Sequence, residues 1–364
     1  MFELNIKLAT IVSLVAATIS LSHSMESCKK SEHHTSRIIG TPLKQEIPPG
    51  FPQPNYTFQN NTLTEEGFSL GRKLFYDGKL SKDGNFSCGS CHQQYSAFST
   101  FDHPFSHGYN NQFSTRNAPS LFNEAWQKEF HLDGGINNIE VQPLAPITSH
   151  NEMSETIENV VYKIKNDTSY NSYFKAAFGD ETVNSQRILK SLAQFTISLV
   201  SANSKYDKVK RGEATFFSYE QHGYELFQTH CATCHPEPMF TDYSYRNTGL
   251  PKDTSLNDLG RMKITNDPKD SLKFKVPSLR NVAVSSPYMH DGRFWFISQC
   301  IRHYRDGIQK SPTLDSSLAK GIQLTEMDIV EINSFLRTLT DTNFLRNPRF
   351  ADPENKRIFS PDVH

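Results

Sequence analysis

The chain has 364 residues, and its 38 Lys plus Arg and 39 Asp plus Glu leave a formal net charge of −1. This near-neutral balance, with no basic stripe, argues against a nucleic-acid-binding protein. The length is enough for one large domain or for two ordinary domains, each with its own core.

The N-terminus has the pattern of an export signal. Lys7 precedes an apolar run over residues 8–21, which is too short to span a bilayer comfortably but suits the core of a secretory signal. Small and polar residues then lead to Cys28, where a lipid anchor would be attached, although only Ser27 before it fits a lipoprotein cleavage box well. The sequence predicts a signal peptide over 1–28, and leaves open a lipidated Cys28 or a simply cleaved secretory protein.

Downstream of the signal, the patterns are mostly helical. Residues 29–60 are polar and proline-rich, which predicts a linker. Apolar residues recur at helical spacing over four stretches, namely 157–164 capped by Ser154, 188–199, 219–227, and 329–339 after a capping box of Thr325 and Asp328. Strand alternation is scarce, and residues 96–150 and 236–290 are rich in Gly, Pro, Asn and Asp. A mainly α fold with long irregular loops is expected.

Four of the six cysteines fall in two C-x-x-C-H motifs, Cys88-Gly-Ser-Cys91-His92 and Cys231-Ala-Thr-Cys234-His235. Two thiols three residues apart on a helical turn can bond the two vinyl groups of one porphyrin, and the adjacent histidine then reaches the iron. Disulfides or a zinc site are the alternatives, but neither explains why a histidine follows each pair directly. The motifs predict two covalently bound haem c groups, which replace much of the usual apolar core.

From about Leu63 to Leu339 the chain resembles the bacterial di-haem cytochrome c peroxidases and their relative MauG. The resemblance rests on motifs in the expected order, namely GRKLFYD at 71–77, FSHG at 105–108, TRNAP at 115–119, DG at 133–134, IEVQ at 139–142, VPSLRN at 276–281 and SPYMHDG at 286–292. It implies two cytochrome c-like haem domains, expected here as a peroxidatic domain over 61–212 and an electron-transfer domain over 213–345. A tail over 346–364 follows.

The resemblance implies roles for residues around the first haem. His92 is the expected proximal ligand of the peroxidatic iron, and His107 matches a histidine that caps this iron in part of the family, unless it is a hydrogen-bonding loop histidine. The family's acid/base glutamate corresponds here to Val141, which cannot move the proton that peroxide cleavage requires. The adjacent Glu140 is therefore the candidate acid/base group, with His107 as the other candidate and Gln142 orienting peroxide.

Around the second haem, His235 is the expected proximal ligand. Tyr304 stands where the peroxidases have methionine and MauG has tyrosine, and an anionic phenolate stabilises oxidised iron. Met289 and His303 are rival ligands, and Met289 is otherwise expected to pack near the haem edge. Leu132 replaces a tryptophan that lies between the haems in the family, so the resemblance provides no aromatic route between them.

The resemblance also implies a calcium ion held by the Asn117 side chain and the Ser285 and Pro287 carbonyls, since hard oxygen ligands suit calcium. The implied function is a peroxidase in the periplasm or cell envelope of a Gram-negative bacterium. It would reduce hydrogen peroxide to water with electrons from a small cytochrome c or cupredoxin. The alternatives are a MauG-like enzyme that oxidises a partner protein or organic substrate through high-valent iron, and a non-enzymatic electron carrier. A homodimer and a lipid anchor are compatible with this, and no nucleic-acid partner is expected.

Overall fold

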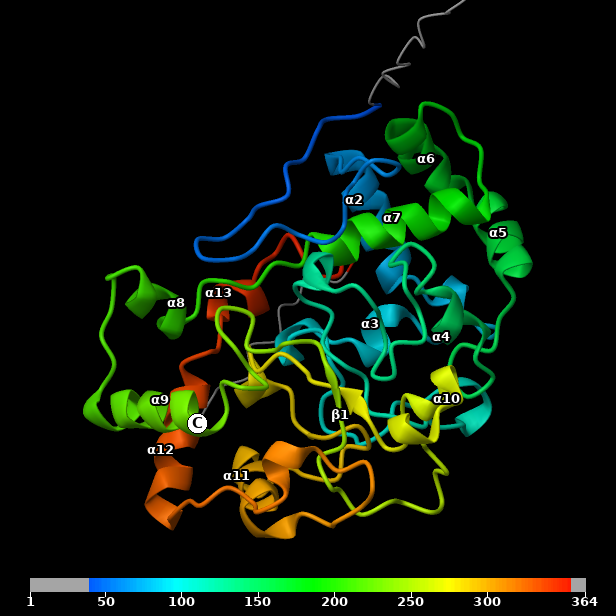
Figure 1. The fold of residues 1–364 in the computed structure, drawn as a ribbon. Coiled ribbons are helices and arrows are strands. Elements are labelled where there is room, and N and C mark those ends of the chain that lie inside the picture. The colour runs from blue at the N-terminus through cyan, green and yellow to red at the C-terminus, as the bar shows by residue number, and fades with distance from the viewer. Residues whose placement is uncertain (1–38, 355–364) are drawn as a thin grey trace, which may run out of the picture. The chain divides into compact units, whose positions relative to one another are not determined.

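The computed structural model describes residues 39–354, so the predicted signal peptide and the lipid-anchor cysteine lie outside the described residues. Its helices are α2 (Glu65–Tyr76), α3 (Cys88–Cys91), α4 (Leu144–Thr148), α5 (Ile157–Lys165), α6 (Asn171–Phe178), α7 (Ser185–Ile197), α8 (Lys205–Lys210), α9 (Ser218–His230), α10 (Met262–Thr265), α11 (Ile297–Arg302), α12 (Glu326–Arg337) and α13 (Thr342–Leu345). Within 39–354 the sheet structure is limited to β1 (Tyr245–Arg246) and β2 (Phe274–Lys275), which pair antiparallel (Figure 1). The predicted mainly α fold is confirmed.

The four predicted helices are present as α5, α7, α9 and α12. The capping box of α12 forms as expected, because Thr325 Oγ1 accepts from the Asp328 N–H and the Asp328 carboxylate accepts from the Thr325 N–H. The predicted cap of α5 was wrong by two residues. Ser154 has a φ of 52°, in the left-handed region, whereas Thr156 has the extended backbone of an N-cap and accepts from the Asn159 N–H.

Each half of the chain contains a crossed helix pair with a glycine at the contact. In the first half α2 packs against α7, and a Cβ atom at Gly71 would lie 1.9 Å from the Ser191 carbonyl oxygen. In the second half α9 packs against α12, and a Cβ atom at Gly223 would lie 2.0 Å from the Glu331 carbonyl oxygen (Figure 1). Glycine is needed at both crossings because any side chain would force the helix backbones apart.

A second feature repeats in the two halves. The stretches Pro-Ser-Leu-Phe-Asn at 119–123 and Pro-Ser-Leu-Arg-Asn at 277–281 both end in an asparagine with a φ of 56°. The Asn123 N–H donates to the Leu199 carbonyl at 2.8 Å, and the Asn281 N–H donates to the Leu339 carbonyl at 3.0 Å. Each stretch is thereby tied to the residues just beyond its own crossed helix, α7 or α12. The two halves follow one structural plan.

The apolar side chains form three clusters. One lies around α2, α5, α6 and α7, and it also takes in Phe344 and Phe350 from the end of the described chain. The second lies around α9, α11 and α12, and the third joins the segment 51–58 to the loop 125–139. None of the helices in residues 39–354 combines the length and the apolar content that crossing a membrane requires.

Residues 39–60 belong to the predicted linker, and in the structure they pack on the rest of the chain. The Trp126 indole N–H donates to the Pro52 carbonyl at 2.7 Å, and the Phe51 ring packs edge-on against the same indole at 5.3 Å. The Ala125 carbonyl accepts from the Asn55 and Tyr56 N–H groups. These contacts make the segment a strap across the loop that follows the first C-x-x-C-H motif.

Two candidate haem sites

The first C-x-x-C-H motif forms the single-turn helix α3 and its C-cap. The His92 N–H donates to the Cys88 carbonyl at 2.9 Å, which places the imidazole directly after the two thiols. His92 Nδ1 lies 2.9 Å from the Phe98 carbonyl oxygen, to which it donates as the tautomer with hydrogen on Nδ1. Burial lowers the pKa of His92, although the bond to Phe98 acts in the opposite direction. A neutral imidazole with Nε2 free is the form that coordinates iron.

The second motif repeats this geometry at the end of α9. The His235 N–H donates to the Cys231 carbonyl at 3.0 Å, and His235 Nδ1 lies 3.0 Å from the Phe240 carbonyl oxygen. Burial again lowers the pKa of the imidazole below its ordinary value. Each motif therefore offers two neighbouring thiols and one oriented, neutral histidine, which are the groups that covalent haem attachment uses. The residues at both sites fit haem c.

Tyr304 lies beside the second motif. It sits in a turn of π-helix, His303–Gly307, that directly follows α11, and such turns are frequent at functional sites. Burial raises the pKa of the Tyr304 phenol, and the thiols of Cys300, Cys234 and Cys231 raise it further because they are close to it. The chain therefore brings the Tyr304 phenol close to the cysteines of the second site.

The two rival ligands are placed differently. His303 is buried, and its Nε2 lies 2.9 Å from the Thr248 carbonyl oxygen, so this nitrogen already has a partner. Met289 has a left-handed backbone with a φ of 73°, and its carbonyl accepts from the Gly292 N–H in a tight turn. This geometry favours Tyr304 over His303, while haem contact by Met289 stays a prediction.

His107 lies on an exposed loop near the first motif. Its ring centroid is 5.2 Å from that of His103 and 4.7 Å from that of Phe113. The preceding residue, Ser106, is buried and forms a hydrogen bond with the Cys91 thiol. Burial raises the pKa of that thiol, whereas this hydrogen bond lowers it. The loop therefore borders the first site, but His107 packs among exposed rings, and its role as cap or base stays a prediction.

The stretch 139–142 turns its side chains in different directions. Glu140 accepts a hydrogen bond from the Tyr56 hydroxyl and so faces the N-terminal strap. Val141 is 39% exposed. Gln142 instead points inward, with its Nε2 3.4 Å from Nε2 of His131. Of the two polar candidates here, Gln142 is the one that faces His131, whereas Glu140 faces the strap.

Glu152 is a candidate that the sequence did not reveal. After α4 the chain folds back, with the Met153 N–H donating to the Pro146 carbonyl, and the Tyr109 N–H donates to the Glu152 carbonyl at 2.7 Å. Burial raises the pKa of the Glu152 carboxyl, and its charge in turn raises that of the Cys91 thiol. A half-buried carboxyl with a raised pKa therefore lies near Cys91, at the first site. No periodicity marks it, because it belongs to an irregular loop.

The expected calcium ligands lie on segments that meet. Asn117 is buried, its N–H donates to the His290 carbonyl at 2.8 Å, and its side-chain amide donates to the Pro104 carbonyl at 3.1 Å. Ser285 and Pro287 belong to the loop that leads to His290. Residues 39–354 contain no group of three or more His, Cys, Asp or Glu suited to a metal ion. The calcium site, which would use an amide and carbonyls, stays a prediction.

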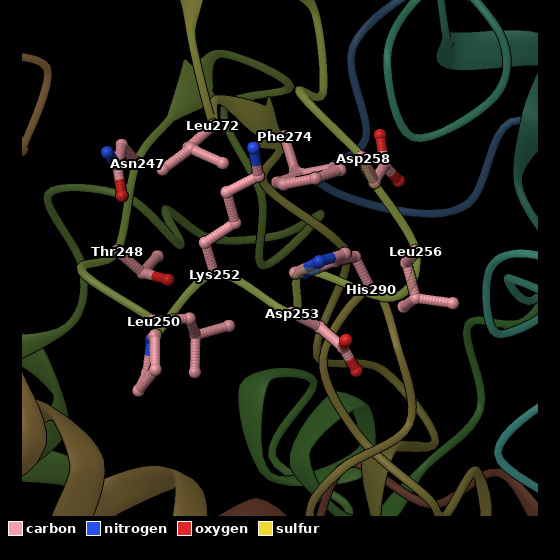
Figure 2. Close-up of a pocket in the computed structure, with 11 residues that line it drawn as sticks. Asn247, Thr248, Leu250, Lys252, Asp253, Leu256, Asp258, Leu272, Phe274 and His290 are labelled. Carbon is pink, nitrogen blue, oxygen red and sulfur yellow. The ribbon is translucent and has the colours of Figure 1, made fainter.

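A separate cavity of about 350 Å³, including its open mouth, lies in the second half. Figure 2 shows its walls, which come from the loop 247–258 together with Leu272, Phe274 and His290. The rings of Phe274 and His290 are stacked at 3.9 Å. Asp258 in the wall receives two hydrogen bonds from Arg116, so the cavity adjoins the loop after the first motif without including either haem motif.

Two c-type attachment motifs with oriented histidines, carried by a mainly α fold, define a di-haem cytochrome. The sequence model of the di-haem cytochrome c peroxidases (CCP_MauG) matches residues 65–215. The methylamine utilization protein MauG of Methylorubrum extorquens is 33% identical over 77% of this chain and 79% of its own length. The cytochrome c551 peroxidase of Nitrosomonas europaea is 32% identical over 74% of this chain and 79% of its own length. The chain belongs to the di-haem cytochrome c peroxidase family.

Comparison with solved structures agrees with this family assignment. A MauG-like protein associated with microbial copper homeostasis superposes with a TM-score of 0.79 at 31% identity, over 85% of this chain and 99% of that protein. The diheme peroxidase BthA of Burkholderia thailandensis shares the fold, with a TM-score of 0.68 at 20% identity over 87% of this chain and 95% of its own. The predicted family, fold class, oxidoreductase activity and two haem c groups are confirmed.

Proposed function

We propose that this enzyme uses hydrogen peroxide at its first haem site to oxidise a residue of a partner protein or an organic substrate, as a MauG-like oxidoreductase. The observation that carries the proposal is the half-buried Tyr304 phenol, which lies beside the Cys231–Cys234 pair in a turn of π-helix. When bound, the haems supply iron centres that hold oxidising equivalents, and a phenolate ligand favours the oxidised state. The similarity to MauG and to the MauG-like protein of known structure agrees with this choice.

The chain's own residues then have distinct tasks. His92 and His235 present Nε2 because Nδ1 of each is held by a backbone carbonyl. Gln142 orients peroxide through its amide. Glu152 would take the proton from one peroxide oxygen and return it to the departing oxygen, since partial burial raises the pKa of its carboxyl.

The acid/base assignment is tested by a matched pair of variants. Glu152→Gln should slow peroxide cleavage by about 10²–10⁴-fold, the range typical of losing a general acid. Glu140→Gln should leave the rate nearly unchanged, since Glu140 is engaged with Tyr56 on the strap. Stopped-flow mixing of the ferric protein with peroxide measures both rates. A slow Glu140→Gln variant beside a fast Glu152→Gln variant would return the role to Glu140.

The second candidate function is a peroxidase that reduces peroxide to water with electrons from a small cytochrome c or cupredoxin. It is favoured by the 32% identity with a cytochrome c551 peroxidase. Steady-state turnover with reduced cytochrome c separates the two. We expect slow turnover and a long-lived oxidised optical spectrum after peroxide, and Tyr304→Phe should shorten that lifetime and shift the ferric spectrum. Rapid turnover, or an unchanged Tyr304→Phe spectrum, would support the peroxidase.

We also propose export to the cell envelope, with calcium bound between the loops that carry Asn117 and Pro287. The signal-like segment 1–28 and the haem motifs support export, since haem c is attached outside the cytoplasm. The buried Asn117 side chain, together with the nearby loop 285–290, supports the calcium site. Cell fractionation tests the first, and metal analysis of the protein with and without Asn117→Ala tests the second.

A further inference from the structure

We propose that His131 is a positioning residue of the first haem site, where its imidazole fixes the orientation of the Gln142 amide. The inference rests on the proposed function, which gives Gln142 the task of orienting peroxide. The family motifs do not point to His131. It stands just before Leu132, which occupies the position of the family's tryptophan.

The backbone at His131 is unusual and firmly held. Its φ is 64°, in the left-handed region that residues other than glycine rarely adopt. The Phe130 N–H donates to the Ile136 carbonyl at 2.6 Å, and the Gly134 N–H donates to the His131 carbonyl at 3.3 Å, which closes the turn. Such conformations persist where the surroundings fix them, and they concentrate at functional sites.

Lys275, from the second half of the chain, also holds this turn through hydrogen bonds. Its N–H donates to the Leu132 carbonyl at 2.7 Å, and its buried ammonium donates to the Glu129 carbonyl and to the Gln127 side chain. The carbonyls of Glu129 and Leu132, on either side of His131, are thereby both bound by Lys275. The backbone that carries the imidazole is therefore held in place from both sides.

That place lies beside the Gln142 side chain. The His131 Nε2 is 3.4 Å from the Gln142 Nε2, a distance at which an unprotonated ring nitrogen accepts a long hydrogen bond from the amide. The turn is also joined to the loop that follows the first haem motif, because Asp133 accepts a hydrogen bond from Arg116 Nη1. With one amide hydrogen engaged, the other hydrogen and the amide oxygen of Gln142 have defined directions.

A double-mutant cycle on the haem-loaded protein tests this, with fluoride binding to the ferric form as the readout. Bound fluoride is stabilised by nearby hydrogen-bond donors, and an optical titration gives its dissociation constant without any turnover. His131→Gly removes the imidazole and suits the left-handed backbone, Gln142→Leu removes the amide, and the third variant carries both changes. Haem content and thermal midpoint serve as controls for folding in each variant.

We expect each single variant to bind fluoride about fivefold more weakly, which corresponds to one hydrogen bond of ordinary strength. The double variant should bind it no more weakly than Gln142→Leu, because the two residues act as one unit. His131→Asn, which tolerates the left-handed backbone and retains a polar partner for the amide, should recover most of the affinity.

The outcomes distinguish the positioning role of His131 from the proposed task of Gln142. Losses that simply add in the double variant, or an unchanged affinity for His131→Gly, would overturn the positioning role and leave Gln142 in place. An unchanged affinity for Gln142→Leu would overturn the proposed task of Gln142, and the role of His131 with it. A His131→Asn variant as weak as His131→Gly would also overturn the hydrogen-bonded pairing.

Discussion

Replacing Arg280 by methionine should strongly destabilise the second half of the protein. Arg280 is 1% exposed, and its Nη1 and Nη2 donate to the two Asp207 carboxylate oxygens at 2.9 and 2.8 Å. Its Nε donates to the Pro238 carbonyl at 2.9 Å. The guanidinium therefore joins α8, the loop after the second haem motif and the Pro-Ser-Leu-Arg-Asn stretch that follows it.

The size of this loss in stability depends on the contacts that Asp207 keeps once Arg280 is replaced. Breaking one side of a buried ion pair typically costs about 3–5 kcal/mol, because the partner is left charged and unpaired. In this protein the Ser204 N–H and hydroxyl still donate to Asp207 at 2.8 and 2.7 Å. The loss in free energy of unfolding should therefore lie at the lower end, about 3 kcal/mol.

The matched control is the more exposed ion pair of Arg187 and Asp180. The Asp180 side chain is 55% exposed, so Arg187→Met should cost less than about 1 kcal/mol. Urea unfolding followed by circular dichroism gives both values, from the midpoint and the slope. Equal, small losses for Arg280→Met and Arg187→Met would refute the reasoning.

The pH dependence offers an independent check. Burial would raise the pKa of Asp207, but the hydrogen bonds and charge of Arg280 outweigh it, and the pKa lies below its ordinary value. A carboxyl with a lowered pKa contributes stability above its unfolded value of about 3.9 and loses it as the pH falls through the folded value. The gap between wild type and Arg280→Met should therefore be constant near neutral pH and shrink in acid.

Two further predictions concern stability. Gly71→Ala should lower the free energy of unfolding by about 3 kcal/mol or more, since its Cβ would meet the Ser191 carbonyl. Gly84→Ala, with open space and a φ of 79°, should cost only about 1–2 kcal/mol. Thermal midpoints compare the two, and equal shifts would contradict a tight helix crossing. Burial raises the pKa of Glu124 to about 8, so folding takes up a proton there and wild-type stability should fall as the pH rises from about 4.5 to 8. Glu124→Gln should flatten that fall, which urea midpoints at about pH 5 and 7.5 measure, and an identical slope in both proteins would show that Glu124 is ionised in the fold.

The sequence by itself determined the cofactor chemistry. Covalent haem attachment needs two thiols and a histidine within five consecutive residues, so both motifs are complete in the local sequence and predict the same structure in any fold. The same holds for α12, whose capping box and apolar spacing lie within a few residues of one another. Tyr304 was likewise proposed from the sequence, by resemblance and not by a local signal, and its ligation of the second iron stays a prediction.

Only the tertiary structure decided which polar residues share a site with those motifs. Glu152 lies 60 residues beyond His92 in an irregular loop, and it comes close to Cys91 only because the chain folds back after α4. Glu140 was a reasonable candidate by alignment, but a turn of a few residues directs it to Tyr56 while Gln142 faces His131. In loops without helical or strand periodicity, side-chain direction depends on long-range hydrogen bonds, and these do not exist until the fold forms.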